Sequence, residues 1–438
     1  MARFLVDVVN ALDLEAIYAS YNEKDGRGLS AYAPAMMVRV LLYGYATGVY
    51  SSRKIQLRTY EDVAFRYLSA DAHPDHSTLA EFRQRHLTAL AGLFTQALQL
   101  CAKAGLVKLG HVAIDGTKIK ANASKHKAMS YGRMSEAEQH LKQEIDGLLK
   151  QAEATDAAED ELYGKGQGGD ELPEELSRRE SRLQKIREAK KALEEEAREK
   201  AEQERAETEQ KLAEREEEEQ RTGKKKRGRK PVPPDPDKAK PADRAQRNFT
   251  DGDSRIMPDG ANKGSFVQGY NAQAAVDSTA QVIVAAELTQ QSNDSGQLLP
   301  MLEQLEANMG RKPDAVSADA GYWSEANATD EKVAGIDLHI ATARMKHDQT
   351  MATDSGPPPD QATAKQAMEH KLRTEAGRAI YTMRKAIVEP VFGQIKEVRG
   401  FRRFSLRGLD NVRAEWRLVC AASNLLKLFR FAWTPKTA

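Results

Sequence analysis

The sequence predicts an α/β core that is interrupted by a long, charged helical insertion and preceded by an all-α segment. Helical patterning over the first hundred or so residues, short apolar runs typical of strands, and a helical stretch crowded with Glu, Lys and Arg support this prediction. We therefore expect four segments: a helical domain at 1–105, the first part of the core at 106–130, the insertion and a basic Pro-rich linker at 131–245, and the second part of the core with C-terminal helices at 246–438.

Composition limits the classes of protein that this chain can represent. Its 438 residues suggest two or three domains, and its net charge of +1 averages very uneven segments. Cys101 and Cys420 have no metal-ligand spacing, so we expect two buried thiols in a reducing cytoplasm. Without an apolar run of about 20 residues or a secretory signal, no membrane partner is expected. Without a phosphate-cradling glycine loop, no nucleotide cofactor is expected.

The first segment has the pattern of short helices joined by polar turns. Residues 35–50 and 55–70 predict two helices, the first entered near Pro34. In a third, at 72–87, Asp75 or Ser77 is the expected cap. That helix is basic, with Arg83 and Arg85 expected, along with Glu81 and His86, on exposed faces. The arrangement resembles a helix-turn-helix that enters a major groove, and an ordinary helical bundle is the alternative.

The insertion is predicted to be a solvated helical hairpin or a weak coiled coil. Leu176 and Leu183 lie seven residues apart, as do Ile186 and Leu193, and residues 164–170 are the expected break. We expect a spacer or an oligomer contact. The basic, Pro-rich linker that starts at Lys224 has little means of folding. Its Arg227 and Arg229 suit the narrow minor groove, with nonspecific phosphate contact as the favoured role.

Alternating apolar positions return after the linker. Two strands are expected, joined by a turn at Asp277-Ser278, and Asn293 or Asp294 should cap the following helix. After these we expect a short strand ending at Asp319, another at 336–342, a loop at 346–370, a helix from about Lys371, and an amphipathic helix from Leu409 to Phe429. This is the element order of an RNase H-like α/β core interrupted once.

Asp115 and Asp319 are the strongest candidates for chemistry. Each follows a short apolar strand and precedes a glycine within two residues, so we expect a turn after each. Strand ends are rigid positions from which side chains project into a shared cleft. Phosphodiester chemistry with Mg²⁺ uses about three carboxylates, because this hard cation prefers oxygen ligands. The alternative is that each Asp is an ordinary turn former.

Five sequence blocks resemble a known family. AIDGTKIKANASK, NFTDGDSRIM, FVQGYNAQAAVD, SADAGYWS and VEPVFGQIKEVRGFRRFSLRGL are similar, in this order, to blocks of the DDE transposases of bacterial insertion sequences, which have an RNase H-like core and a Tyr-Arg-Glu-Lys signature. The resemblance implies that Asp115, Asp319 and Glu389 are catalytic and bind Mg²⁺, for which Mn²⁺ could substitute. It also implies that residues 1–105 bind DNA ends, that inverted repeats and target DNA are partners, and that a dimer or larger oligomer forms on DNA.

The signature residues can also be interpreted physically. Glu389 and Lys396 are seven apart and share a face of an ideal helix, so one could ligate metal while the other holds a phosphate. Tyr381 and Arg384 also share a face and could position DNA. Four residues, rather than the usual three, separate Arg384 from Glu389. Pro390 predicts a kink or a helix start at Glu389, and Glu397 is an acidic rival.

Further DNA contacts are expected around these positions. Trp323 could stack on an unstacked base, with a place in the core as the alternative. Cations expected at phosphates are Lys118, Lys120, Arg399, Arg402, Arg403 and Arg407. The rival functions are a catalytically silent, transposase-derived DNA-binding regulator, a structural coiled-coil protein, and a host nuclease of the same fold.

Overall fold

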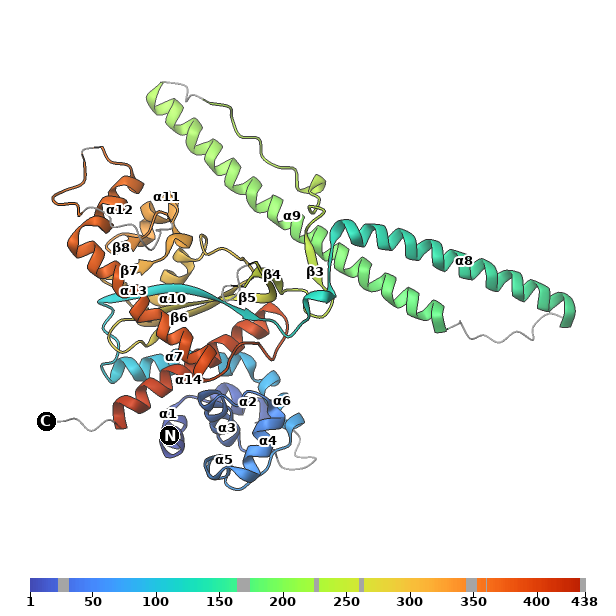
Figure 1. Ribbon diagram of the computed structural model, residues 1–438, viewed down its shortest axis with the longest axis horizontal. Helices are drawn as coiled ribbons and strands as arrows, with labels where there is room; N and C mark the ends of the chain where they lie inside the picture. The colour runs from blue at the N-terminus through green and yellow to red at the C-terminus, as the bar shows by residue number, and fades with distance from the viewer. Residues whose placement is uncertain are drawn as a thin grey trace. The chain divides into compact units, whose positions relative to one another are not determined.

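The computed structural model describes residues 1–22, 31–163, 174–223, 228–259, 264–343, 353–359 and 361–433. The chain divides into two compact units, shown in Figure 1. Unit 1 consists of Met1–Asn122 and Met257–Ala438, and unit 2 is Ala123–Ile256. The fold is mixed α/β, with one mixed sheet and many helices. Among the described residues, no helix combines the length and the apolarity needed to cross a bilayer.

Unit 1 begins with helices, as predicted. They are α1 (Ala2–Ala11), α2 (Glu15–Asn22), α3 (Pro34–Thr47), α4 (Ser52–Glu61), α5 (Val63–Leu68), α6 (His76–Arg85) and α7 (Leu87–Lys103). Asp75 is confirmed as the cap of α6, since its side chain accepts a hydrogen bond from the Ser77 N–H. The expectation that Arg83 and His86 lie on exposed faces was wrong, because both are buried, whereas Glu81 and Arg85 are exposed.

The sheet is built around β1 (His111–Lys120). This strand pairs antiparallel with β5 (Phe266–Asp277) and parallel with β7 (Ala315–Ala318). Farther out, β6 (Ile283–Thr289) is antiparallel to β5, β8 (Asp337–Ile340) is parallel to β7, and β4 (Arg255–Pro258) also pairs with β5. The predicted turn after Asp115 was wrong. The strand continues to Lys120 because β5 supplies backbone partners along its whole length.

Helices complete unit 1. They are α10 (Leu298–Met309), α11 (Glu325–Thr329), α12 (Ala364–Arg373), α13 (Glu375–Gly393) and α14 (Leu409–Trp433). The predicted cap of α10 was wrong, because Gln297 holds that position. Residues 364–370 are helical rather than a loop, since Thr363 and Gln366 form a capping box, while 344–352 and 360 lie outside the described residues.

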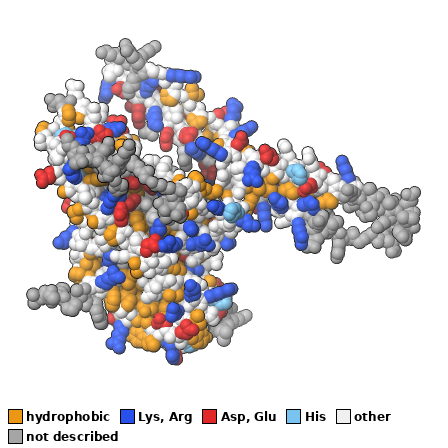
Figure 2. All heavy atoms as spheres, in the orientation of Figure 1, with side chains coloured by type: hydrophobic (Ala, Val, Ile, Leu, Met, Phe, Trp, Pro, Cys, Tyr) orange, Lys and Arg blue, Asp and Glu red, His pale blue; other side chains and the backbone are white. Residues whose placement is uncertain are grey.

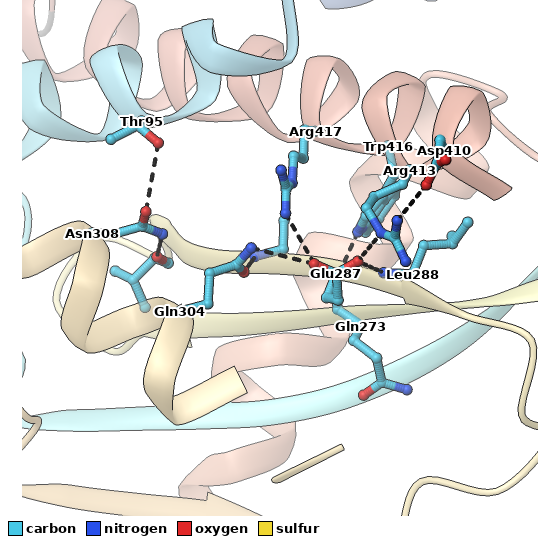
Figure 3. A network of polar contacts seen from close by, with 12 residues as sticks. Thr95, Gln273, Glu287, Leu288, Gln304, Asn308, Asp410, Arg413, Trp416 and Arg417 are labelled. Atoms are coloured by element: carbon cyan, nitrogen blue, oxygen red, sulfur yellow. Dashed lines mark hydrogen bonds and ion pairs between the residues drawn. The ribbon is translucent and has the colours of Figure 1, made fainter. Parts of the chain in front are cut away.

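The amide of Asn424 fixes α14 against the edge of β6. Its Nδ2 donates to the Ile283 carbonyl at 2.8 Å, and its Oδ1 accepts from the Ile283 N–H at 2.9 Å. Figure 3 shows a second set of contacts, in which Arg413 and Arg417 of α14 converge on Glu287 of β6. The Asn424 contacts satisfy backbone groups of a strand that would otherwise be an open edge. The arginines add ion pairs to the Glu287 side chain, so α14 is held at a fixed position along β6.

Both cysteines are buried thiols, as expected. Cys101 of α7 belongs to the core cluster that also contains Ile114 of β1 and Leu298 of α10. Burial raises the pKa of the Cys101 thiol to about 12 and raises that of Cys420 as well. Neither group is therefore a nucleophile at neutral pH.

Unit 2 contains the predicted helical hairpin. Its elements are η1 (Lys125–Lys127), β2 (Ala128–Ser130), α8 (Tyr131–Tyr163), α9 (Glu174–Thr222), η2 (Pro236–Lys238) and β3 (Gln246–Asn248). Leu183, Ile186 and Leu193 of α9 are buried against Met134 and Leu141 of α8. The expected break at 164–170 lies outside the described residues. The linker was expected to have little means of folding, but η2 packs on α9, where Asp237 lies 3.5 Å from Arg198.

Glu138 joins the two long helices of unit 2. Its carboxylate accepts from Lys190 and Arg187 of α9 at 3.1 Å each and pairs with Lys142 of its own helix at 3.2 Å. Burial raises the pKa of Glu138, but these three cations outweigh it and lower the pKa to about 2. Since the folded pKa lies below the ordinary value of 4.5, the stabilisation is present above pH about 4.5 and is lost as the pH falls toward 2.

We predict that Glu138→Gln lowers the free energy of unfolding of unit 2 by about 1 kcal/mol at pH 7. The difference from the wild type should shrink as the pH falls from about 4.5 toward 2, measured by urea unfolding followed by far-ultraviolet circular dichroism. Glu209→Gln, which removes an exposed pair with Arg205 within α9, is the control and should cost about 0.3–0.5 kcal/mol. A constant difference across this pH range would contradict the assignment.

Candidate active site

Asp115 and Asp319 lie side by side. The parallel register of β1 and β7 pairs Ile114 with Ala318, so the next residue of each chain segment is one of the two aspartates. Asp319 follows the end of β7, caps η3 (Ala320–Tyr322) and accepts from the Gly321 N–H at 2.8 Å. Asp115 lies within β1 rather than at its end, and its side chain is 20% exposed. The site thus holds two carboxylates, one largely buried.

Arg384 of α13 is the direct partner of Asp115. Its Nη1 lies 3.0 Å from Asp115 Oδ2, its side chain is 9% exposed, and its guanidinium lies over the ring of Tyr381. Burial raises the pKa of Asp115 to about 6, an effect that Arg384 opposes and that Asp319 and Asp294 reinforce. The predicted DNA-contacting Tyr381 and Arg384 are therefore beside the aspartates, where the cation balances buried negative charge.

Sequence reasoning missed Asp294, a third carboxylate near the first two. Its Oδ1 accepts from Asn271 Nδ2 at 2.6 Å and from Gln273 Nε2 at 2.7 Å, and lies 3.9 Å from Lys118 Nζ. A Cβ atom added to Gly321 would lie 3.0 Å from Asp319 Oδ1 and 3.4 Å from Asp294 Oδ2. Both carboxylates therefore approach one point. The available signal was the pair of polar residues, Asn271 and Gln273, on one face of an apolar strand.

Gln273 links Asp294 to the loop that bears Asp319. Its Oε1 accepts from the hydroxyl of Tyr322, which is fully buried three residues after Asp319. Burial raises the pKa of Tyr322, and the three aspartates add to this effect, so the hydroxyl remains a donor. Among the described residues, the Oδ1 atom of Asn271 finds no hydrogen-bond partner, and it lies in the same cluster. Asn271, Gln273, Asp294 and Tyr322 thus form a polar layer that is hydrogen-bonded to the loop bearing Asp319.

Glu389 is exposed on α13 and follows Arg384, the partner of Asp115, by five residues, which is about 140° around an ideal helix. Within the described residues, no three His, Cys, Asp or Glu side chains are arranged to hold a metal ion. The helix start expected at Glu389 was wrong, because α13 continues through Pro390. The carbonyl of Ala386, which loses its helical donor to this proline, accepts instead from Gln281 Nε2 at 2.9 Å.

Lys396 lies beside β1. Its Nζ donates to Thr117 Oγ1 at 3.0 Å and lies 3.5 Å from the Lys118 carbonyl. The segment Gln394–Val398 is a π-helix, so the seven-residue spacing from Glu389 does not place both side chains on one α-helical face. The rival carboxylate of Glu397 is exposed and pairs with Arg402.

The other predicted contact residues fall into three groups. Arg85, Lys120, Arg229, Arg402, Arg403 and Arg407 are exposed. Arg83 and Arg399 are buried, so the expectation of one exposed basic stripe was wrong for Arg399, whose Nη2 donates to Ser423 Oγ at 3.2 Å. Trp323 is partly buried against the core cluster, Lys118 is partly buried beside Asp294, and Arg227 lies outside the described residues.

Comparisons with known families define the class of this protein. Residues 236–425 match the family described as "Transposase DDE domain", and residues 1–85 match "Transposase domain (DUF772)". Both matched families are transposase families, and their combination in one chain is typical of insertion-sequence transposases. The first match contains Asp319 and Glu389 but begins after Asp115. No curated protein and no solved structure matches the chain.

Gly116 is required by the crowding beside Asp115. A Cβ atom at this position would lie 2.4 Å from Gln273 Nε2, 2.8 Å from Asp294 Oδ1 and 2.9 Å from Asn271 Oδ1. We predict that Gly116→Ala destabilises unit 1 by about 1–3 kcal/mol, because the polar layer must move. Guanidinium unfolding followed by tryptophan fluorescence measures this loss.

Gly92→Ala is the matched control, since the added methyl group meets nothing within 4 Å on helix α7. It should stabilise unit 1 by about 0.5–1 kcal/mol. Equal stability of Gly116→Ala and the wild type would show that the polar layer is not packed as described.

Proposed function

We propose that this transposase binds the terminal inverted repeats of its element and, with Mg²⁺, cleaves the DNA strand at each end to free a 3′-hydroxyl, which it then directs at target DNA. The adjacency of Asp115 and Asp319 on parallel strands carries this proposal. The sheet also supports an RNase H-like core, because β5 runs antiparallel to both of its neighbours β6 and β1, while β7 and β8 are parallel to β1.

In this proposal Asp115, Asp319 and Glu389 hold the divalent ions. DDE transposases use divalent metal ions, and the donor chemistry of the aspartate pair suits Mg²⁺ (or Mn²⁺), because close, buried carboxylates are relieved of repulsion by a cation. When bound, such ions activate an oxygen nucleophile and neutralise charge on the leaving oxygen. Arg384 is the cation of the protein that contacts Asp115.

Glu389 needs a change in α13 to join this pair. It lies five residues after Arg384, so it faces about 140° away around an ideal helix. Helix α13 packs on β1 and β7. A rotation of this helix about its axis when DNA binds would bring Glu389, in place of Arg384, to Asp115. Lys118, Lys120 and Lys396 neutralise phosphates of the bound strand. Two ends must be joined in one event, so the active form is at least dimeric, with α8 and α9 as the proposed contact.

A catalytically silent DNA-binding regulator is the second candidate. The Arg384–Asp115 ion pair favours it, because a cation of the protein already neutralises one of the proposed metal ligands. Both functions require DNA binding, but only the first requires nicking.

We predict that Asp115→Asn, Asp319→Asn and Glu389→Gln each slow nicking of a labelled repeat-end duplex by roughly a thousand-fold, which corresponds to about 4 kcal/mol. DNA binding should be retained, because none of these changes removes a cation. Nicking is measured in Mg²⁺ on denaturing gels, and binding by filter retention. Glu397→Gln is the control, since Glu397 is exposed and pairs with Arg402, and its rate should equal that of the wild type.

The pattern of losses separates the candidates. If Glu389→Gln nicks DNA at the wild-type rate and Asp294→Asn does not nick it, the third catalytic acid is Asp294 and not Glu389. A wild-type protein that binds repeat ends and never nicks them would establish the regulator.

A further inference from the structure

Helices α3 and α4 form a tight helix-turn-helix. The turn between them, residues 48–51, contains Gly48 with φ +82°, and the Val49 N–H donates to the Gly44 carbonyl at 2.7 Å. A Cβ on Gly44 would lie 2.7 Å from the Val49 carbonyl oxygen and 3.2 Å from Ile55 Cδ1. Glycine at both positions therefore permits the close approach of α4 to α3, in a turn of the length typical of this motif.

The two helices differ in what they expose. Val38, Leu41, Leu42 and Tyr45 of α3 are fully buried. Helix α4 buries only Ile55 and Thr59; Ser52 and Gln56 are partly buried, and its other side chains are exposed. Figure 1 shows α4 among α3, α5 and α6, and the packing against α5 and α6 leaves one long face of α4 free. The second helix of the motif is thus the one available to a ligand.

That face combines cations with apolar groups. Arg53, Lys54 and Arg58 are exposed, and within the described residues none of them forms an ion pair, while Glu61 is the only acidic residue of α4. Beside the cations lie Leu57, 54% exposed, and Tyr60, 53% exposed. Free positive charge on a helix suits the phosphates on both sides of a major groove.

The neighbouring helices lack such free cations. In α6, Arg83 is buried and donates to Tyr45 Oη and to the Tyr50 carbonyl at 3.2 Å each, and Arg85 pairs with Glu81. In α5, Arg66 pairs with Asp71 at 2.8 Å. The basic helix expected from the sequence, α6, therefore has its charges already engaged.

The exposed Tyr60 is held in place. Its ring stacks on His73 with centroids 3.9 Å apart, and His73 Nδ1 lies 3.3 Å from Thr59 Oγ1. Gln56 Oε1 accepts from the His76 N–H at 3.2 Å, which ties α4 to the start of α6. A rigid, half-exposed aromatic ring loses little conformational entropy on binding.

We propose that α4 is the recognition helix of this protein and enters the major groove of duplex DNA at the element's ends. Arg53, Lys54 and Arg58 contact phosphates, and Leu57 and Tyr60 meet base edges, including thymine methyl groups. The inference rests on the proposed function for the identity of the ligand and adds which surface reads it. The charge of the face selects DNA rather than a protein partner.

The test uses the full chain and two labelled duplexes, one with the element's terminal repeat and one with the same bases scrambled. The triple variant Arg53→Ala/Lys54→Ala/Arg58→Ala should bind the repeat 10- to 100-fold more weakly in fluorescence anisotropy. The slope of log affinity against log salt should fall by about 2–3, since each lost phosphate contact removes about 0.9. Leu57→Ala should instead reduce the preference for repeat over scrambled DNA by about 5- to 100-fold.

Arg66→Ala is the control, because it removes an exposed cation that is already paired. It should bind like the wild type, and circular dichroism should show that all variants keep their helical content. Unchanged affinity and salt slope in the triple variant would overturn the assignment, as would a large loss with Arg85→Ala, which would return the role to α6.

Failure of the proposed function gives a different result. A wild-type chain that does not distinguish repeat from scrambled DNA and never nicks either would refute that function, whereas normal nicking by the triple variant would refute only the role of α4. Loss of a wild-type dimer in the triple variant, seen by light scattering without DNA, would identify α4 as a protein interface and also overturn the proposal.

Discussion

Asp115 and Asp319 are held at adjacent positions, next to the paired residues Ile114 and Ala318 of two parallel strands. Placing two carboxylates so close, one of them largely buried, costs free energy that other residues of unit 1 must offset. Burial is the main reason that the pKa of Asp115 is raised to about 6, and the nearby charges of Asp319 and Asp294 raise it further. Arg384 supplies the opposing charge from α13. That helix is retained on the sheet although Pro390 removes one of its hydrogen bonds, because Gln281 satisfies the carbonyl that is left over. The carboxylates therefore require a cation on α13, which is Arg384. Gln281, from the turn before β6, donates to the carbonyl that Pro390 leaves unpaired.

One of the residues that bind Asp294 depends on α14. Trp416 Nε1 donates to the Gln273 carbonyl at 3.0 Å, so the strand residue that binds Asp294 is fixed by a helix more than a hundred residues later. Figure 3 shows this contact beside the Glu287 cluster. The side chain of Gln273 also accepts from the Tyr322 hydroxyl, so a single residue, Gln273, connects α14 to the loop that bears Asp319. The geometry of the aspartates is thus set by the sheet and maintained by contacts from α13 and α14.

Local signals were sufficient for much of this architecture, but not for side-chain environments. The apolar runs before Asp115 and Asp319 identified two neighbouring strands, and the Asp75 cap marked the start of α6. The length of β1 depends on β5, which is about 150 residues away. Arg83 was mistaken for a surface cation because its burial depends on Tyr45, which in turn donates to the buried Glu415 of α14 at 3.2 Å. Asp294 had the local pattern of a helix cap, and only Asn271 and Gln273 of β5 reveal its place at the site.

The net charge of +1 is compatible with DNA binding, because the basic residues differ in whether they are paired with a carboxylate. Along α9, Arg198, Arg205 and Arg215 each pair with a glutamate four residues later, and Figure 2 shows positive and negative side chains intermixed on the long helices. Such a surface neutralises itself and gains little from phosphate. Within the part of the chain that the structure describes, Arg53 and Arg58 of α4 have no carboxylate partner, so they have no such ion pair to lose on meeting DNA. Pairing, rather than the number of basic residues, therefore decides which helix is suited to DNA.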